Sequence, residues 1–200
     1  AKHFRDWRSG AAGTLPFELK LGRFLLRGNL PAVYLSGAAR VVLGEMKGKH
    51  HCQHGLDALL LSAINSDIKI VEFAELKKDR PQQRTRPSHS HEQAKTHLHD
   101  LLELFASGQT QALPFNPDAG FAYVKRQASG FNEKVWEAAE KALPEQDIWW
   151  STALRGGDPF IDHADRPETF PASVAFRDIS LKVFSACAPE FIGSEDIGDD

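Results

Sequence analysis

The segment GEMKGKHHCQHGLDALLL, residues 44–61, places a polar, histidine-rich stretch directly before an apolar run. In that run Leu56, Leu59 and Leu60 recur at helical spacing, and the pattern continues without a helix breaker as far as Ile64. We therefore expect a helix over residues 53–64. Because short apolar segments lie on both sides of it, this helix decides the fold class: strands, then a helix, then a strand.

Short strands are expected on both sides of this helix. Upstream, apolar and polar side chains alternate over residues 17–27, and apolar residues cluster again at 32–35 and 40–43, with Gly28 and Asn29 as the first turn. Downstream, residues 68–73 indicate a fourth strand. The first three strands are predicted to form an antiparallel meander, and the fold class is α/β.

The second half of the chain is predicted to be helical, after a basic loop. Residues 77–91, KKDRPQQRTRPSHSH, contain almost no apolar side chain, so we expect a mobile loop there. Ser90 and Gln93 form a capping-box pattern for a helix that ends at Gly108. Further helices are expected at 131–143 and from about Pro171. We expect one domain over 1–192, cut from a longer chain, and a disordered acidic tail at 193–200.

The composition is ordinary for a globular protein. The 200 residues carry a formal net charge of −3, so contacts with nucleic acid would need a local basic patch. Cys52 and Cys187 do not resemble a disulfide framework, which favours a reducing, cytoplasmic setting. No apolar run has membrane-spanning length, and we expect no signal peptide.

One hypothesis for the histidine-rich stretch is a zinc-stabilised interaction module. His50, Cys52 and His54 are ligand types that zinc prefers, but they crowd into one segment without a second, spaced pair. His97 and His99 alternate in a predicted helix and therefore point to different faces. A polar turn with solvated histidines explains the pattern more simply.

A second hypothesis is a metal-dependent nuclease that uses Glu45 and Lys47. At the end of a strand both side chains would leave the same face, where a carboxylate holds a divalent cation beside a lysine that steadies charge. The element order also suits the restriction-endonuclease-like family, whose signature is PD…(D/E)xK. However, no Asp or Glu lies between Glu18 and Glu45, and Pro31 occupies the expected place of the second acid. A hard cation then has too few oxygen ligands.

Several longer motifs are more specific than Glu-x-Lys. They are LGRFLLRGNLP at 21–31, GLDALLLSAI at 55–64, EQAKTHLHDLLELFASGQTQALPFNP at 92–117, and ALRGGDPF at 153–160 with FRDISLKVFSA at 176–186. On these motifs the chain resembles the C-terminal region of RecC, the gamma subunit of exodeoxyribonuclease V (the RecBCD helicase–nuclease). The third and fourth motifs carry most of the resemblance.

The resemblance implies a degenerate PD-(D/E)xK-type core, a three-stranded meander followed by a helix and a strand, with additional C-terminal helices. It implies a non-catalytic scaffold in the bacterial cytoplasm that contacts RecD and RecB and helps guide DNA strands in double-strand break repair and recombination. Pro31, Glu45 and Lys47 are then the remains of an active-site edge. The resemblance also implies that this domain binds no cofactor, while partner subunits use ATP and Mg²⁺.

Two features are candidates for contacts with DNA or partner subunits. The first is the basic loop, whose side chains suit phosphates or an acidic face of RecD, with a solvated loop as the alternative. Its candidate residues are Lys77, Lys78, Arg80, Arg84 and Arg86. The second is the pair Trp149 and Trp150, which cannot both face one core. One of them is expected to be an exposed anchor for a partner, unless both are buried across a bend.

Overall fold

The computed structural model describes residues 2–76, 80–130, 134–143, 154, 160 and 171–192. The chain divides into two compact units, residues 1–102 and 103–200. The described part is a mixed α/β protein, with a five-stranded mixed sheet in the first unit and helices in both. Among the described helices, none is long and apolar enough to cross a membrane.

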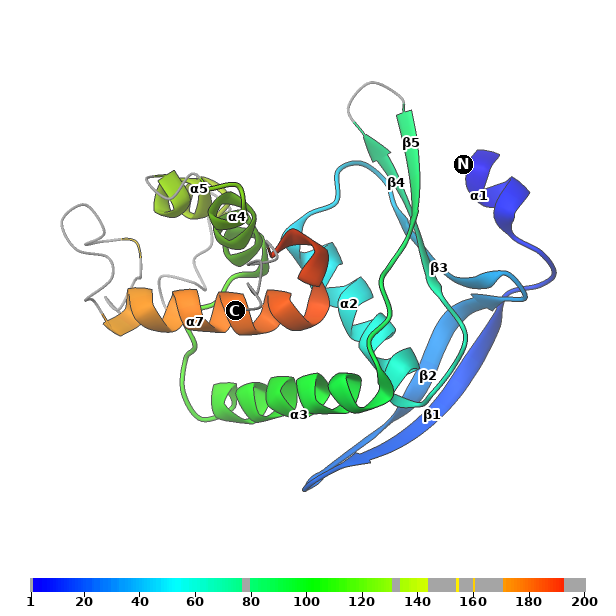
Figure 1. Ribbon diagram of the computed structural model, residues 1–200, viewed down its shortest axis with the longest axis horizontal. Coiled ribbons are helices and arrows are strands. Elements are labelled where there is room, and N and C mark those ends of the chain that lie inside the picture. Colours follow the sequence, from blue (N-terminus) through cyan, green and yellow to red (C-terminus); the bar gives the residue numbers. More distant parts are fainter. Residues whose placement is uncertain are drawn as a thin grey trace, which may run out of the picture. The chain divides into compact units, whose positions relative to one another are not determined.

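The sheet of the first unit has its strands in sequence order (Figure 1). Strands β1 (Gly13–Leu21), β2 (Phe24–Tyr34) and β3 (Gly37–Val42) run antiparallel, β4 (Ile70–Leu76) lies parallel to β3, and β5 (Arg80–Thr85) lies antiparallel to β4. Parallel neighbours need a crossover connection, which helix α2 (Gly48–Ala63) supplies. The three-stranded antiparallel meander, the helix and the fourth strand are thus confirmed, although the predicted strand over residues 17–27 covers the end of β1, the turn and the start of β2.

The first turn is not where the sequence predicts it. β1 and β2 are joined at Gly22 and Arg23, and Gly22 adopts the left-handed conformation with φ +55°. Gly28 instead lies within β2, paired with Phe17 of β1. A Cβ at Gly28 would lie 2.9 Å from Cζ of Phe17, so the aromatic ring covers this glycine. The prediction of a turn at Gly28 and Asn29 is therefore wrong.

Helices α1 (Lys2–Trp7) and α2 contact opposite faces of the sheet. Successive residues of a strand point to opposite faces, and β3 and β4 show this at Ala38 and Ala39 and at Ile70 and Val71. Ala38 and Ile70 pack with Ala58 and Leu61 of α2. The α1 face packs Ala39, Val71 and Phe73 against Phe4, Trp7 and Tyr34. Each helix therefore covers an apolar patch on its face of the sheet.

A bulge interrupts the pairing of β2 with β1. Gly13 pairs with Val33 and Leu15 with Leu30, so Pro31 and Ala32 of β2 stand against a single residue of β1. Ala32 has a φ of +56°, a conformation that costs a non-glycine residue roughly 1–2 kcal/mol. The bulge turns this part of β2 towards the rim of a pocket, described below.

The basic segment is partly a strand, which corrects the prediction of a mobile loop over residues 77–91. Arg80–Thr85 pairs with β4 from Leu76 to Val71. Pro81 is tolerated because β5 is an edge strand of the described sheet. The sequence pattern misses β5 because its stabilisation comes from backbone pairing and buried charge rather than from apolar side chains. Lys77 and Lys78 lie outside the described residues.

Helix α3 (His91–Gly108) begins in the first unit and is capped as predicted. The backbone N–H of Gln93 donates to Oγ of Ser90, and the backbone N–H of Ser90 donates to Oε1 of Gln93, each at 3.3 Å. Ala94 and Leu98 are its buried residues.

The second unit contains α4 (Pro117–Ala128), α5 (Val135–Lys141), α7 (Pro171–Cys187) and the 3₁₀ turn η2 (Pro189–Phe191). The helices α5 and α7 are confirmed, whereas α4 is not predicted from the sequence. Its start is nevertheless encoded locally: Oδ1 of Asn116 accepts from the backbone N–H groups of Asp118 and Ala119, and Pro117 follows the cap. The acidic residues 193–200 lie outside the described residues.

The core of the second unit is largely aromatic. Phe121 packs on Phe184, and Tyr123 packs edge-on against Phe176. Gly120 lets α4 and α7 approach closely, because a Cβ there would lie 2.8 Å from Oγ of Ser180.

Candidate functional site

Two charged side chains lie on the α2 face of the sheet, where the apolar pattern predicts none. Arg40 of β3 and Glu72 of β4 are paired in the parallel ladder, and they are 8% and 2% exposed. Buried charges are stable only when they are paired and hydrogen-bonded. The helix α2 supplies a partner for each of them, Asp57 for Arg40 and His54 for Glu72, from adjacent turns of one helical face.

Arg40 ties three elements together. Its Nε donates to Oδ2 of Asp57 at 2.5 Å, and its Nη1 donates to the carbonyl oxygens of Pro31 at 3.2 Å and Ala39 at 2.7 Å. The third guanidinium nitrogen, Nη2, is buried and has no hydrogen-bond partner within the described part of the chain. Arg40 therefore holds the β2 bulge, β3 and α2 in register, with one donor unused.

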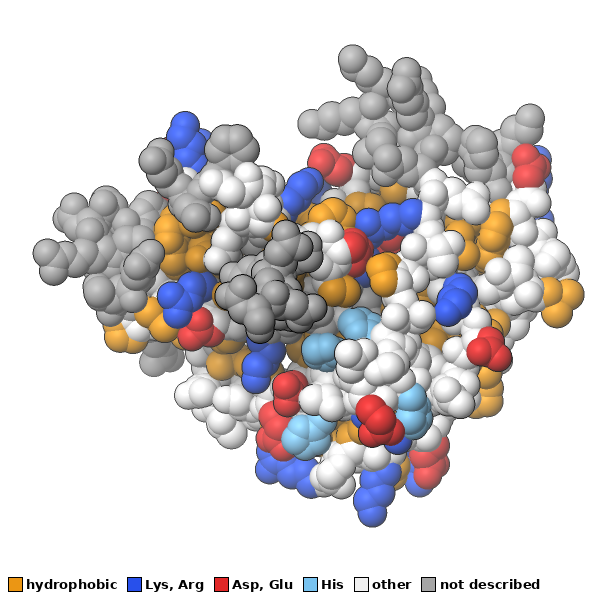
Figure 2. Space-filling view, in the orientation of Figure 1, with side chains coloured by type: hydrophobic (Ala, Val, Ile, Leu, Met, Phe, Trp, Pro, Cys, Tyr) orange, Lys and Arg blue, Asp and Glu red, His pale blue; other side chains and the backbone are white. Residues whose placement is uncertain are grey.

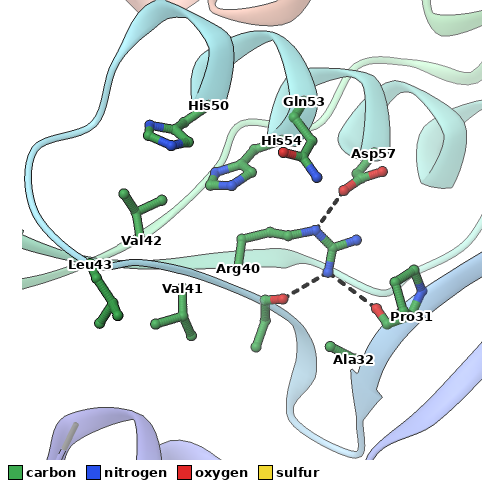
Figure 3. Close-up of a pocket in the computed structure, with 11 residues that line it drawn as sticks. Pro31, Ala32, Arg40, Val41, Val42, Leu43, His50, Gln53, His54 and Asp57 are labelled. Atoms are coloured by element: carbon green, nitrogen blue, oxygen red, sulfur yellow. Dashed lines mark hydrogen bonds and ion pairs between the residues drawn. The ribbon is translucent and has the colours of Figure 1, made fainter.

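A pocket of about 410 Å³ lies beside this ion pair. In Figure 3, His50, His54, Gln53 and Asp57 extend from α2 on one side, and Pro31 and Ala32 of the bulge stand on the other. Val42 of β3 adds an apolar wall. The pocket is therefore built from the bulge, the end of β3 and the first half of α2.

Glu72 is the centre of a second, more deeply buried network. Its Oε1 accepts from Nδ1 of His54 at 2.8 Å and from Nε of Arg86 at 2.9 Å, and its Oε2 accepts from Nε of Arg84 at 2.5 Å. Burial by itself would raise the pKa of Glu72, but the hydrogen bond from His54 and the charges of Arg86 and Arg84 outweigh it. The pKa of Glu72 is held well below its ordinary value, so the carboxylate stays ionised.

His51 of α2 completes this network as a neutral acceptor. Its Nδ1 lies 3.4 Å from Nη2 of Arg84 and 3.3 Å from Nη2 of Arg86, so both guanidinium groups donate to it. Burial, then the charges of Arg86 and Arg84, lower the pKa of His51 from 6.5 to about 3. The network thus joins α2, β4 and β5 through an ionised Glu72 and a neutral His51.

The nuclease candidates Glu45 and Lys47 do not form part of this site. β3 ends at Val42, so the expectation that both side chains leave one face of a strand is wrong. Both residues are exposed, and neither lines the pocket. Lys47 is the N-cap residue of α2, and its backbone N–H donates to Nδ1 of His50 at 3.0 Å. Pro31, in contrast, does lie at the pocket rim.

The remaining predicted residues fall into two groups. Across the described residues, no three His, Cys, Asp or Glu side chains are grouped so that they could hold a metal ion, and this includes His50, Cys52 and His54. Arg84 and Arg86 are described above, and Arg86 is buried in the Glu72 network. Lys77, Lys78, Trp149 and Trp150 lie outside the described residues, as does the side chain of Arg80.

Of the residues that organise the site, sequence reasoning missed Arg40, Asp57 and Glu72, and it singled out His54 only as a zinc ligand. A signal for three of them exists. Arg40 and Glu72 are single charges inside apolar strand segments, AARVVL and IVEFA, and Asp57 interrupts the apolar run of α2. A lone charge inside an apolar segment predicts a buried pair.

The fold and the site define an α/β domain whose pocket and sheet face are organised by internal ion pairs. The family model described as RecC C-terminal domain matches residues 1–128, which is more than half of the chain and includes the whole first unit. The chain therefore belongs to the RecC C-terminal domain family, and RecC is part of the RecBCD complex, which implies a role in DNA repair and recombination. No curated protein matches the chain significantly.

Proposed function

We propose that this chain is a non-catalytic scaffold domain of the RecBCD complex in the bacterial cytoplasm. It contacts RecD and RecB and helps to guide DNA strands, while ATP and Mg²⁺ are used by the partner subunits. Its own residues provide binding surfaces and hold the sheet rigid.

The order of elements supports descent from a restriction-endonuclease-like core. α1, the β1–β3 meander, α2 and the parallel strand β4 follow one another as in that fold, and the additional helices come later in the chain. The bulge at Pro31 and Ala32 lies at the rim of the pocket, where the sequence pattern expects the missing acid.

The observation that carries the proposal is the ion pair made by Asp57, the one carboxylate among the described residues that line the pocket. Asp57 is ion-paired with Arg40, which is itself anchored to two carbonyl oxygens. A hydrolytic metal centre needs several converging oxygen ligands and an open coordination position. In this pocket a guanidinium group supplies the positive charge instead, and it cannot activate a water molecule as a metal ion does.

The contacts with DNA and partners are proposed for the residues singled out in the sequence. Arg86 is buried and acts by holding β5, whereas Arg84 is partly exposed beside it. Lys77, Lys78 and Arg80 are our candidates for contacts with phosphates or with an acidic face of RecD. On the face shown in Figure 2, the described basic and acidic side chains are interspersed. A contact with phosphate therefore needs a local group of basic residues, and Lys77, Lys78 and Arg80 are close together in the sequence.

Co-expression with RecB and RecD tests the scaffold role. The chain is expected to co-purify with RecD, and replacement of Lys77, Lys78 and Arg80 by alanine is expected to weaken binding of single-stranded DNA at low salt. A folded chain that never co-purifies with RecD would contradict the proposal.

Incubation with labelled linear DNA and Mg²⁺ or Mn²⁺ tests the non-catalytic role. No cleavage is expected from the chain alone. Cleavage that is abolished by Glu45→Ala but retained in Glu18→Ala, an exposed control, would show a surviving nuclease.

A further inference from the structure

The sheet of the first unit opens between β2 and β3. Within the described residues these two strands pair at two positions, the last of them Val33 with Ala38. Beyond Ala38, β3 continues beside β4 as far as Val42, whereas β2 turns away at its bulge. The pocket described above lies in this opening, with Pro31 and Ala32 on the β2 side and the last residues of β3 on the other. One edge of β3 is therefore open beside the pocket.

The backbone of Val41 faces this open edge. In a strand, the N–H and C=O of one residue point to the same side, and those of the next residue point to the other side. Ala38 donates to the carbonyl oxygen of Lys69 at 2.8 Å, so its backbone groups are directed to β4. Arg40 and Val42, at even steps along β3, are directed to β4 as well. Val41 lies between them, directs its N–H and C=O away from β4, and has no strand partner on that side among the described residues.

Two backbone carbonyl groups close to Val41 are already used. The carbonyl oxygens of Ala39 and Pro31 both accept from Nη1 of Arg40. Pro31 also has no backbone N–H to donate. An incoming chain can therefore pair with β3 at Val41, but it cannot pair with β2 at the bulge.

The two outer edges of the described sheet are protected against pairing with another chain, and the inner edge is not. The outer strand β1 carries Pro16 and Lys20, and the outer strand β5 carries Pro81. Proline and charged side chains on an edge strand prevent another strand from joining it. The inner edge instead carries Val41 and Leu43, which are 51% and 92% exposed. An extended peptide joins a sheet as an added strand at an unprotected edge of this kind.

The side chains on both faces of the edge specify the added strand. In Figure 3, Val41 and Leu43 point away from α2, whereas Val42 points towards it. Successive residues of an added strand also point to opposite faces. The residue on the side of Val41 and Leu43 should therefore be apolar. Its neighbour enters the pocket beside Gln53 and Asp57 and should be polar.

We propose that an extended segment of RecD docks on this edge and adds to the sheet as a strand antiparallel to β3. One residue of that segment exchanges two backbone hydrogen bonds with Val41, and its apolar side chains cover Val41 and Leu43. The proposal rests on the proposed contact with RecD, and it adds the surface and the form of the bound segment. A second copy of the chain fits the edge poorly, because its own β3 edge is flanked by the bulge and α2, which would collide with the same elements here.

The test compares hydrogen exchange in the chain alone, in the chain with RecB, and in the assembled complex with RecB and RecD. Mass spectrometry follows the peptides that contain Val41 and Leu43. Exchange at Val41 is expected to slow by about tenfold or more, and only when RecD is present. Peptides from the outer strand β1 between Pro16 and Lys20 are the internal control, and their exchange should not change.

Two variants, each with a matched control, assign the effect to the edge. Val41→Pro removes the outward N–H but no bond of the β3–β4 ladder, and it is expected to weaken assembly with RecD by about tenfold or more. Val41→Thr keeps the N–H and the branched side chain, so it should assemble normally. Leu43→Asp should also weaken assembly, and because Leu43 lies beyond the end of β3 it stays informative even if Val41→Pro fails to fold. Leu35→Asp, at a residue of the β2–β3 turn that is 91% exposed and outside the pocket, should assemble like the native chain.

Three outcomes would overturn the proposal. Slow exchange at Val41 in the chain alone shows that the edge is covered by the chain itself, or by a second copy if the protection grows with protein concentration. Protection with RecB alone assigns the edge to RecB. Assembly with RecD that leaves Val41 unprotected, and that Leu43→Asp does not weaken, removes this docking edge and keeps the scaffold role. A folded chain that does not assemble with RecD contradicts the scaffold role itself.

Discussion

Replacing Glu72 by glutamine removes a buried carboxylate that is ion-paired with Arg86, while keeping the size of the side chain. In the native protein Glu72 accepts from His54, Arg84 and Arg86, and the side chain of Arg86 is 1% exposed. Glutamine still accepts through its carbonyl oxygen. Its amide N–H₂, however, replaces an oxygen acceptor and faces a guanidinium donor, so the buried ion pair of Arg86 with Glu72 is lost without a gain of water.

The expected loss follows from how buried pairs behave when one partner is removed. Breaking a buried pair typically costs about 3–5 kcal/mol, because the surviving charge stays uncompensated in a medium that solvates it poorly. Since whole domains are stable by only about 5–15 kcal/mol, Glu72→Gln is expected to leave the first unit marginally folded at room temperature.

Urea unfolding followed by circular dichroism measures this loss, and hydrogen exchange of the β4 amides assigns it to the first unit. The matched control is Glu18→Gln, which breaks the ion pair with Arg27 on the outside of the β1–β2 hairpin, where both side chains are more than half exposed. Exposed pairs contribute at most about 1 kcal/mol. Equal losses in the two variants would refute the view that Glu72 neutralises a buried charge.

Three further predictions concern single sites. Because the pKa of His51 is lowered from 6.5 to about 3, the unfolded chain takes up a proton before the folded one, so stability should fall as pH drops below 6.5. Glu72, whose pKa is also depressed, adds to the loss of stability below pH 4.5. In His51→Asn, the loss of stability between pH 6.5 and pH 4.5 should be absent when unfolding is followed against pH. Gly120→Ala should destabilise the second unit by about 1–3 kcal/mol in urea, since its Cβ would lie 2.8 Å from Oγ of Ser180. Ala32→Gly should raise the thermal midpoint or leave it unchanged, because φ is +56° there.

The sequence predicts the meander, α2, β4, α3 and α7 because each has an apolar period that matches its structure. It misplaces the first turn because alternation runs on through β1 and β2 and gives no sign of the break at Gly22. It misses β5 because this strand is polar and joins the sheet through backbone pairing and the Glu72 network. It also misses α4, whose only strong signal is the cap at Asn116.

The candidate site is less predictable than the fold for a physical reason. Motif reasoning searches for residues close together in sequence, such as Glu45 and Lys47, and those two prove to be exposed and outside the pocket. The residues that do meet, Arg40, Asp57 and Glu72, come from β3, α2 and β4, and only the parallel crossover brings them together. Their common signal is charge within an apolar segment, which predicts burial with a partner but does not name that partner.

The Arg40–Asp57 pair allows a test of what a buried ion pair adds to stability. A buried ion pair is often no more stabilising than apolar side chains of similar volume, because the cost of removing two charges from water offsets their attraction. The double variant Arg40→Met with Asp57→Leu should therefore unfold at a urea concentration close to that of the native chain. Either single variant should be far less stable, because each leaves one buried charge alone. A double variant as unstable as the single variants would show that the pair contributes more to stability than apolar side chains would.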